Sequence, residues 1–121
     1  MPLMVKISMK QGEIWWIELD PTIGAEIKKT RPALVINTNA LGKLPLKIIV
    51  PITDWKEHYL NYPWMVKIDP SSQNGLSKIS AADCFQIRSV STERLNGLIG
   101  SVEPDTVSRV QEAIYKVIGT L

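Results

Sequence analysis

The hydrophobic pattern of the chain changes once, close to residue 104. Before that point the apolar residues fall into short runs of strand length, separated by Gly, Pro, Asn, Asp and Ser residues that favour turns. From Pro104 the apolar residues recur every three or four positions up to Gly119, which predicts an amphipathic helix. Short strands at close spacing followed by one helix predict a mainly β fold with some α, in which the C-terminal helix packs on a small barrel.

The expected strands are rich in β-branched and aromatic residues. They cover residues 12–19, 32–36, 46–52, 64–68, 82–90 and 98–101. Within the first of them Trp15 and Trp16 alternate, so one side chain is expected in the core and the other outside it. Residues 21–30 show no helical or strand period, which predicts a long exposed loop, and such loops in small domains are usually functional.

The length and composition are typical of one folded domain. The chain has 121 residues, and 45% of them are hydrophobic. We expect residues 9–121 to form the domain and residues 1–8 to be a flexible N-terminal extension. The first apolar run is too short for a signal peptide, and no run approaches the roughly 18 apolar residues of a membrane span. The sequence therefore predicts a cytoplasmic protein with no membrane partner.

Cys84 and His58 are the only residues of their types in the chain. A disulfide within the chain is therefore impossible, and a zinc site built from Cys and His lacks its ligands. The sequence also lacks the motifs of serine hydrolases, zinc proteases, P-loop proteins and dinucleotide-binding folds. We expect neither a metal nor a cofactor, a buried structural role for Cys84, and a solvated loop around His58.

Positive charge is concentrated in one segment. The net charge is only +2, yet residues 26–47 carry five Lys or Arg side chains and one Glu. A small net charge argues against broad, tight coating of nucleic acid. A local basic segment is compatible with a site that engages a short stretch of a polyanion.

Several short segments, taken in chain order, resemble the MazF/PemK family of toxins. The segment Lys29-Thr30-Arg31-Pro32-Ala33, followed later by Pro51-Ile52-Thr53, is a fairly specific part of the match. The resemblance covers roughly residues 9 to 119 and includes segments 9–14, 19–26, 29–36, 50–53, 75–78, 86–90, 94–95 and 99–100.

The resemblance implies a fold, an activity and partners. It implies an SH3-like β-barrel of the MazF/CcdB type with a C-terminal helix, and a homodimer. It also implies the toxin of a type II toxin–antitoxin system: a ribosome-independent endoribonuclease that cuts single-stranded mRNA at short sequences. Family members are silenced by a cognate antitoxin protein, and the complex with the antitoxin binds DNA.

The motifs also imply the site residues. Arg31 and Thr53 take the positions of the catalytic pair, and Glu26 and Gln86 take supporting or RNA-contacting positions. Lys28 and Lys29 are either solvated loop residues or contacts to the RNA backbone, and we include them among the RNA-binding candidates.

One position departs from the family pattern. Several members have Asp directly before the Gln that corresponds to Gln86, whereas this chain has Phe85 there and Asp83 two residues earlier. A role assigned to that Asp in relatives therefore does not transfer to Asp83.

These residue types suit metal-independent RNA cleavage. RNA carries its own nucleophile, the 2′-hydroxyl, and its attack gives a 2′,3′-cyclic phosphate and a 5′-hydroxyl end. The planar guanidinium of Arg31 binds phosphate oxygens and stays charged, and the hydroxyl of Thr53 donates to the phosphate or fixes Arg31. The general base stays open between Glu26, His58 and water. Two alternatives also stay open: a CcdB-like toxin that binds gyrase, and a catalytically silent homologue that binds RNA or an antitoxin.

Overall fold

The computed structural model describes residues 9–21, 23–26 and 30–119, and the predicted N-terminal extension, residues 1–8, lies outside them. The strands are β1 (Glu13–Glu18), β2 (Thr30–Val35), β3 (Leu46–Asp54), β4 (Met65–Ile68), β5 (Ser80–Asp83), β6 (Arg88–Ser91) and β7 (Leu95–Ser101). The helix α1 spans Pro104–Ile118, and short 3-10 turns lie at η1 (Asn39–Leu41), η2 (Glu57–Asn61), η3 (Cys84–Gln86) and η4 (Thr92–Arg94). The prediction of a mainly β protein with a C-terminal helix is confirmed.

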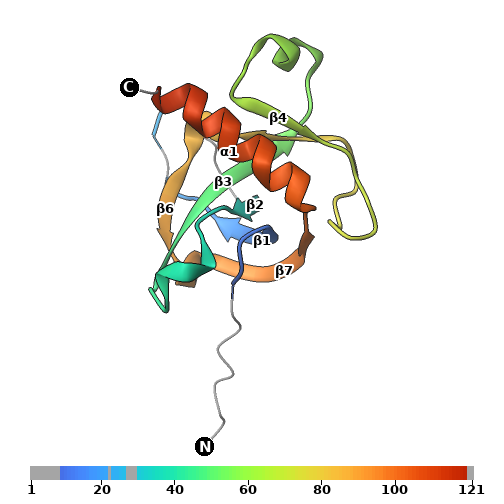
Figure 1. The fold of residues 1–121 in the computed structure, drawn as a ribbon. Coiled ribbons are helices and arrows are strands. Elements are labelled where there is room, and N and C mark those ends of the chain that lie inside the picture. The colour runs from blue at the N-terminus through green and yellow to red at the C-terminus, as the bar shows by residue number, and fades with distance from the viewer. Residues whose placement is uncertain (1–8, 22, 27–29, 120–121) are drawn as a thin grey trace, which may run out of the picture.

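The strands form one antiparallel sheet, and α1 lies across it (Figure 1). The strand order is β4-β5-β3-β2-β1-β7, and β6 pairs with β3 outside this path. The long strand β3 pairs with β6 through Leu46–Ile49 and with β5 through Ile52–Asp54. Among the described strands the sheet does not close, because β4 and β7, at the two ends of the order, do not pair with each other. The architecture is therefore an open, barrel-like sheet rather than a closed barrel.

The prediction of one continuous strand over residues 82–90 was wrong. The chain forms β5, turns through η3 and continues as β6. The cause is the side chain of Asp83, whose Oδ1 accepts a hydrogen bond from the backbone N–H of Phe85 at 3.1 Å. This is an N-cap interaction, and it draws the backbone out of the extended conformation although the residues around it are apolar.

The two faces of the central strands are both buried, which explains their alternating but strongly apolar sequences. On one face Ile14, Leu34, Val50 and Ile52 cluster with Val110 of α1 and with residues of β4 and β5. The opposite face forms a second cluster that includes Trp15, Ile17, Ala33, Val35 and Ile49.

Single residues in this core also match their predictions. Trp15 is 3% exposed whereas Trp16 is 44% exposed, as the alternation within β1 predicts. Cys84 is fully buried as expected. Burial and the nearby Asp83 raise the pKa of its thiol to about 12, so the group is not a nucleophile at neutral pH.

A turn at residues 73–75 packs tightly against β7. The backbone N–H of Ser101 donates to the carbonyl of Gln73 at 3.0 Å. The backbones approach so closely that a Cβ on Gly100 would lie 2.5 Å from Asn74 and Gln73 backbone atoms. Gly75 sits on the same contact with a φ of +70°. Glycine is required here both for space and for backbone conformation.

Candidate active site

The register between β2 and β3 brings Arg31 and Thr53 together. Ala33 lies opposite Pro51 in the antiparallel ladder. Two residues further along each strand, in opposite directions, lie Arg31 and Thr53. The Nη1 of Arg31 donates to the Oγ1 of Thr53 at 3.4 Å, and both side chains are half-buried. Two residues that are far apart in the sequence are thus neighbours on one face of the sheet.

This face is the one that carries the second core cluster. Ala33 and Val35 project from β2 into that cluster, and Arg31 shares their side of the strand because side chains alternate. Arg31 therefore lies where the core ends and solvent begins. A charged group in this position is partly desolvated yet open to a ligand, which strengthens its interaction with an anion.

A hollow of about 450 Å³ lies near the pair, although neither Arg31 nor Thr53 lines it. Pro51, which does line it, lies two residues before Thr53 on the same side of β3. The residues that line it are Leu19, Glu26, Pro51, Phe85, Gln86, Ile87 and Arg88. The hollow thus combines a carboxylate, an amide and a guanidinium with an exposed aromatic ring.

Gln86 is held by Asp83. Its Nε2 donates to Asp83 Oδ2 at 2.9 Å, while Asp83 Oδ1 accepts from the backbone of Phe85. Asp83 is 5% exposed, and burial raises the pKa of its carboxyl against the opposing effect of these hydrogen bonds. One buried carboxylate therefore fixes both Phe85 and Gln86 at the edge of the hollow.

Glu26 also lines the hollow. Its Oε1 accepts a hydrogen bond from the backbone N–H of Ile23 at 2.5 Å, which closes a short turn in the exposed segment before β2. The structure thus places two of the RNA-binding candidates, Glu26 and Gln86, around one hollow beside Arg31 and Thr53. The other two, Lys28 and Lys29, lie outside the described residues.

Of the seven lining residues, only Glu26 and Gln86 were predicted as site residues from the sequence, and among the others Arg88 and Phe85 bear on function. Arg88 lies two positions after Gln86, in a segment that the resemblance covers. Side chains two positions apart in a strand share a face, so this spacing could have predicted that Arg88 lies beside Gln86. Phe85 was noted only as a departure from the family pattern, and its 62% exposure was not foreseen.

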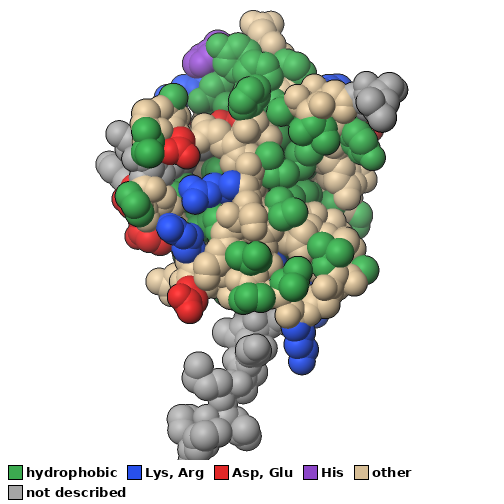
Figure 2. All heavy atoms as spheres, turned by 90° about the vertical axis from the view of Figure 1, so that its left-hand side faces the viewer, with side chains coloured by type: hydrophobic (Ala, Val, Ile, Leu, Met, Phe, Trp, Pro, Cys, Tyr) green, Lys and Arg blue, Asp and Glu red, His purple; other side chains and the backbone are tan. Residues whose placement is uncertain are grey.

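His58 lies in the 3-10 turn η2 and is exposed, as expected for a solvated segment. Its ring is 4.7 Å from that of Tyr59 and 5.7 Å from that of Tyr62, and it is not among the residues of the hollow. Figure 2 shows hydrophobic side chains over the upper part of one face of the molecule, with a small group of Lys and Arg side chains nearer the centre of that face. Within the described ranges, no group of three or more His, Cys, Asp or Glu side chains could hold a metal ion.

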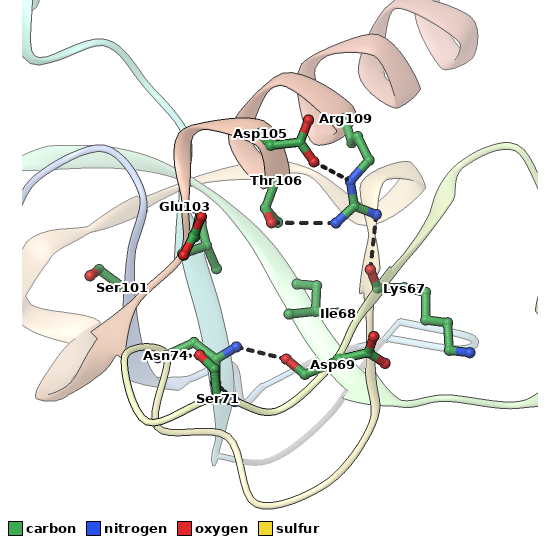
Figure 3. Close-up of a pocket in the computed structure, with 11 residues that line it drawn as sticks. Lys67, Ile68, Asp69, Ser71, Asn74, Ser101, Glu103, Asp105, Thr106 and Arg109 are labelled. Atoms are coloured by element: carbon green, nitrogen blue, oxygen red, sulfur yellow. Dashed lines mark hydrogen bonds and ion pairs between the residues drawn. The ribbon is translucent and has the colours of Figure 1, made fainter.

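A second hollow, of about 350 Å³, lies where α1 begins (Figure 3). Arg109 reaches across it and donates to the carbonyl of Lys67 at 3.1 Å and to Thr106 Oγ1 at 3.3 Å. Its Nε lies 3.4 Å from Asp105 Oδ2. These contacts tie α1 to β4, so Arg109 has a structural role here.

No helix in the described part of the chain is long and apolar enough to cross a membrane.

The fold and the residue pattern define a family. Residues 10–118 match the model of the PemK-like, MazF-like toxins of type II toxin–antitoxin systems, and the chain belongs to this family. It is 32% identical over 112 residues to the endoribonuclease MazF9 of Mycobacterium tuberculosis, covering 88% of this chain and 92% of that protein. It is 29% identical over 103 residues to the endoribonuclease PemK of Escherichia coli, covering 84% and 75% of the two chains.

Solved structures share the fold. MazF from Deinococcus radiodurans superimposes with a TM-score of 0.77 at 24% identity, covering 93% of this chain and 97% of that one. A mycobacterial endoribonuclease in complex with its cognate antitoxin gives a TM-score of 0.73 at 18% identity, covering 94% and 98%. At these identities the likeness establishes the fold, including the packing of the C-terminal helix on the open, barrel-like sheet.

Proposed function

We propose that the chain is a metal-independent, sequence-specific endoribonuclease, the toxin of a type II toxin–antitoxin system, that cleaves single-stranded RNA. The observation that carries the proposal is the contact between Arg31 and Thr53, two residues along β3 from Pro51, which lines a hollow together with Glu26, Gln86 and Arg88. Membership of the toxin family supports it, as do the relatives named as endoribonucleases.

The proposed reaction uses the nucleophile in the RNA. The 2′-oxygen attacks the adjacent phosphorus, the new O2′–P bond forms, and the bond from phosphorus to the 5′-oxygen breaks. Negative charge grows on the phosphate oxygens as this happens, and the guanidinium of Arg31 is placed to bind them. The hydroxyl of Thr53 holds Arg31 in position and is itself a donor toward the phosphate. The products are a 2′,3′-cyclic phosphate and a 5′-hydroxyl.

Two protons move in this reaction, one from the 2′-hydroxyl and one to the 5′-oxygen. Arg31 is a poor proton acceptor because a guanidinium stays protonated at working pH. Glu26 is the one carboxylate among the described residues that line the hollow, so we assign the 2′-hydroxyl proton to Glu26. Water delivers the proton to the departing 5′-oxygen. His58 lies among the rings around η2, and we give it no part in this step.

The proposed partners follow the relatives. A solved mycobacterial endoribonuclease forms a complex with its cognate antitoxin. We propose that this chain forms a homodimer and also binds an antitoxin. The antitoxin would compete with RNA for the hollow near Arg31 and Thr53, and the complex would bind DNA. The small net charge of +2 fits a site that engages a short RNA segment.

The test is cleavage of a long single-stranded RNA by the purified protein in EDTA. The wild type should cut at defined sites, Arg31→Ala should lose nearly all activity, and single-stranded DNA should stay intact because it lacks the 2′-hydroxyl. Lys116→Ala, which removes an exposed cation from the last turn of α1, is the matched control and should cut normally. Intact RNA with the wild type, cleavage only after a metal is added, or full cleavage by Arg31→Ala would contradict the proposal.

A further inference from the structure

Three aromatic side chains form a continuous row that begins at the hollow. Phe85 lines the hollow, and its ring centroid lies 5.6 Å from that of Trp64 in an edge-to-face contact. The ring of Trp64 stacks on Tyr62, with centroids 4.9 Å apart and planes 12° from parallel. We call Tyr62, Trp64 and Phe85 the aromatic row. It runs from the hollow toward the segment between β3 and β4, which projects from the body of the fold above β4 (Figure 1).

Contacts from the protein hold Phe85 in place although its ring is exposed. The backbone N–H of Cys84 donates to the carbonyl of Trp64 at 2.9 Å, which joins η3 to the start of β4. Asp83 accepts from the backbone of Phe85 itself. Trp64 packs against the core beneath α1, so it supports the Phe85 ring from the protein side. Phe85 is 62% exposed and Tyr62 is 37% exposed, so the row presents a contiguous apolar patch, which is a feature of binding surfaces.

We propose that Phe85 is a stacking platform for an RNA base next to the cleaved phosphate, with Trp64 and Tyr62 fixing its ring. This inference rests on the proposed function. An aromatic ring offers its face to any base, and stacking of this kind is a main source of affinity for single strands. The chemistry next to the ring favours a nucleic acid as occupant. Arg88 lines the same hollow, as does Glu26, and Arg31 lies on the neighbouring strand β2, so a base on Phe85 would have two guanidinium groups nearby for its phosphates.

Gln86 strengthens this assignment. It follows Phe85 directly and lines the same hollow, so one short turn presents a flat apolar surface and an amide side by side. A base needs both, a surface for its face and a polar group for its edge. The turn therefore offers a base both contacts, with Phe85 supplying affinity through its ring face and Gln86 supplying a polar group for the edge of the base.

The experiment measures binding of an RNA that cannot be cleaved. The cut site is first mapped on a long RNA, and an oligonucleotide of that sequence is made with a 2′-deoxy sugar at the cut. Phe85→Ala should weaken its binding between about fivefold and 150-fold. Phe85→Leu, which keeps apolar volume without a ring, should weaken it similarly, and Phe85→Trp should restore it. Tyr115→Ala is the matched control, since Tyr115 on α1 is also 62% exposed, and it should bind as the wild type does.

A second substitution identifies the base. Abasic nucleotides are placed one at a time on either side of the cut, and one of them should weaken binding to the wild type while having little further effect on Phe85→Ala. The inference is overturned if Phe85→Ala or Phe85→Leu binds like the wild type, or if no abasic position is coupled to Phe85. It is also overturned if only binding of an antitoxin segment is lost. Failure of the proposed function is distinct, because the wild type would then leave all RNA uncut.

Discussion

Replacement of Asp83 by Ala tests whether one buried carboxylate organises the edge of the site. The change removes the acceptor for the Phe85 backbone at 3.1 Å and the acceptor for Gln86 Nε2 at 2.9 Å. An N-cap interaction contributes about 1 kcal/mol, and a second buried hydrogen bond contributes a similar amount. We therefore expect Asp83→Ala to lower the free energy of unfolding by about 2 kcal/mol at the acid end of the range in which the protein is folded.

The loss should shrink as pH rises. Burial raises the pKa of Asp83 in the folded protein above its ordinary value of 3.8, so the folded state holds this proton more tightly than the unfolded state does. The contribution of Asp83 to stability is then fully present below pH 3.8 and falls as pH rises through the higher, folded-state pKa. Above that pKa the ionised carboxylate carries a desolvation penalty, which offsets part of its hydrogen bonding.

The assay is urea denaturation of wild type, Asp83→Ala and Asp83→Asn between pH 4 and 7. The difference between wild type and Asp83→Ala should decrease with pH, because other titrating groups cancel between the two proteins. Asp83→Asn keeps an acceptor for the Phe85 backbone but has no proton to lose, so its difference from Asp83→Ala should stay constant. A gap between wild type and Asp83→Ala that is flat or widens with pH would refute this reasoning.

Three other predictions concern single side chains. Thr53→Val keeps the shape of the side chain but removes the partner of Arg31, so single-turnover RNA cleavage should slow by between about tenfold and 150-fold, and an unchanged rate would remove Thr53 from the mechanism. Gly100→Ala places a Cβ 2.5 Å from backbone atoms of the neighbouring turn and should lower the free energy of unfolding by about 1–3 kcal/mol in thermal or urea melts, whereas wild-type stability would show that the turn moves freely. Cys84, with a pKa of about 12, should resist a thiol reagent at pH 8 in the native protein and react in urea; rapid native labelling would contradict its burial.

The strands and the helix could be predicted because the spacing of apolar residues along the sequence differs between the two kinds of element. The alternation in β1 predicted one buried and one exposed tryptophan, and the spacing after Pro104 predicted the bounds of α1 closely. The break inside residues 82–90 could not be predicted from apolar content. It depends on a hydrogen bond from a backbone N–H to the Asp83 side chain, and the same apolar residues would also suit a continuous strand.

The position of the site residues relative to one another could not be predicted from the spacing of apolar residues. Nothing in the spacing of Arg31 and Thr53 shows that they are neighbours, because a long connection separates β2 from β3 and the register sets their contact. Their pairing was expected through the family resemblance, and the structure supplies its geometry. The exposure of Phe85 and the rings around His58 arise only when η3, β4 and η2 come together, so the sequence offered no period that would reveal them.

Single-turnover cleavage of the mapped RNA in EDTA, with analysis of the new ends, tests the central claim most directly. The wild type should produce 2′,3′-cyclic phosphate and 5′-hydroxyl ends. Arg31→Ala should be slower by about 10² to 10³, the usual cost of losing one donor to a developing oxyanion. Equal rates for the two proteins, or ends that carry a 5′-phosphate, would contradict the account, because the first removes Arg31 from the chemistry and the second removes the 2′-hydroxyl.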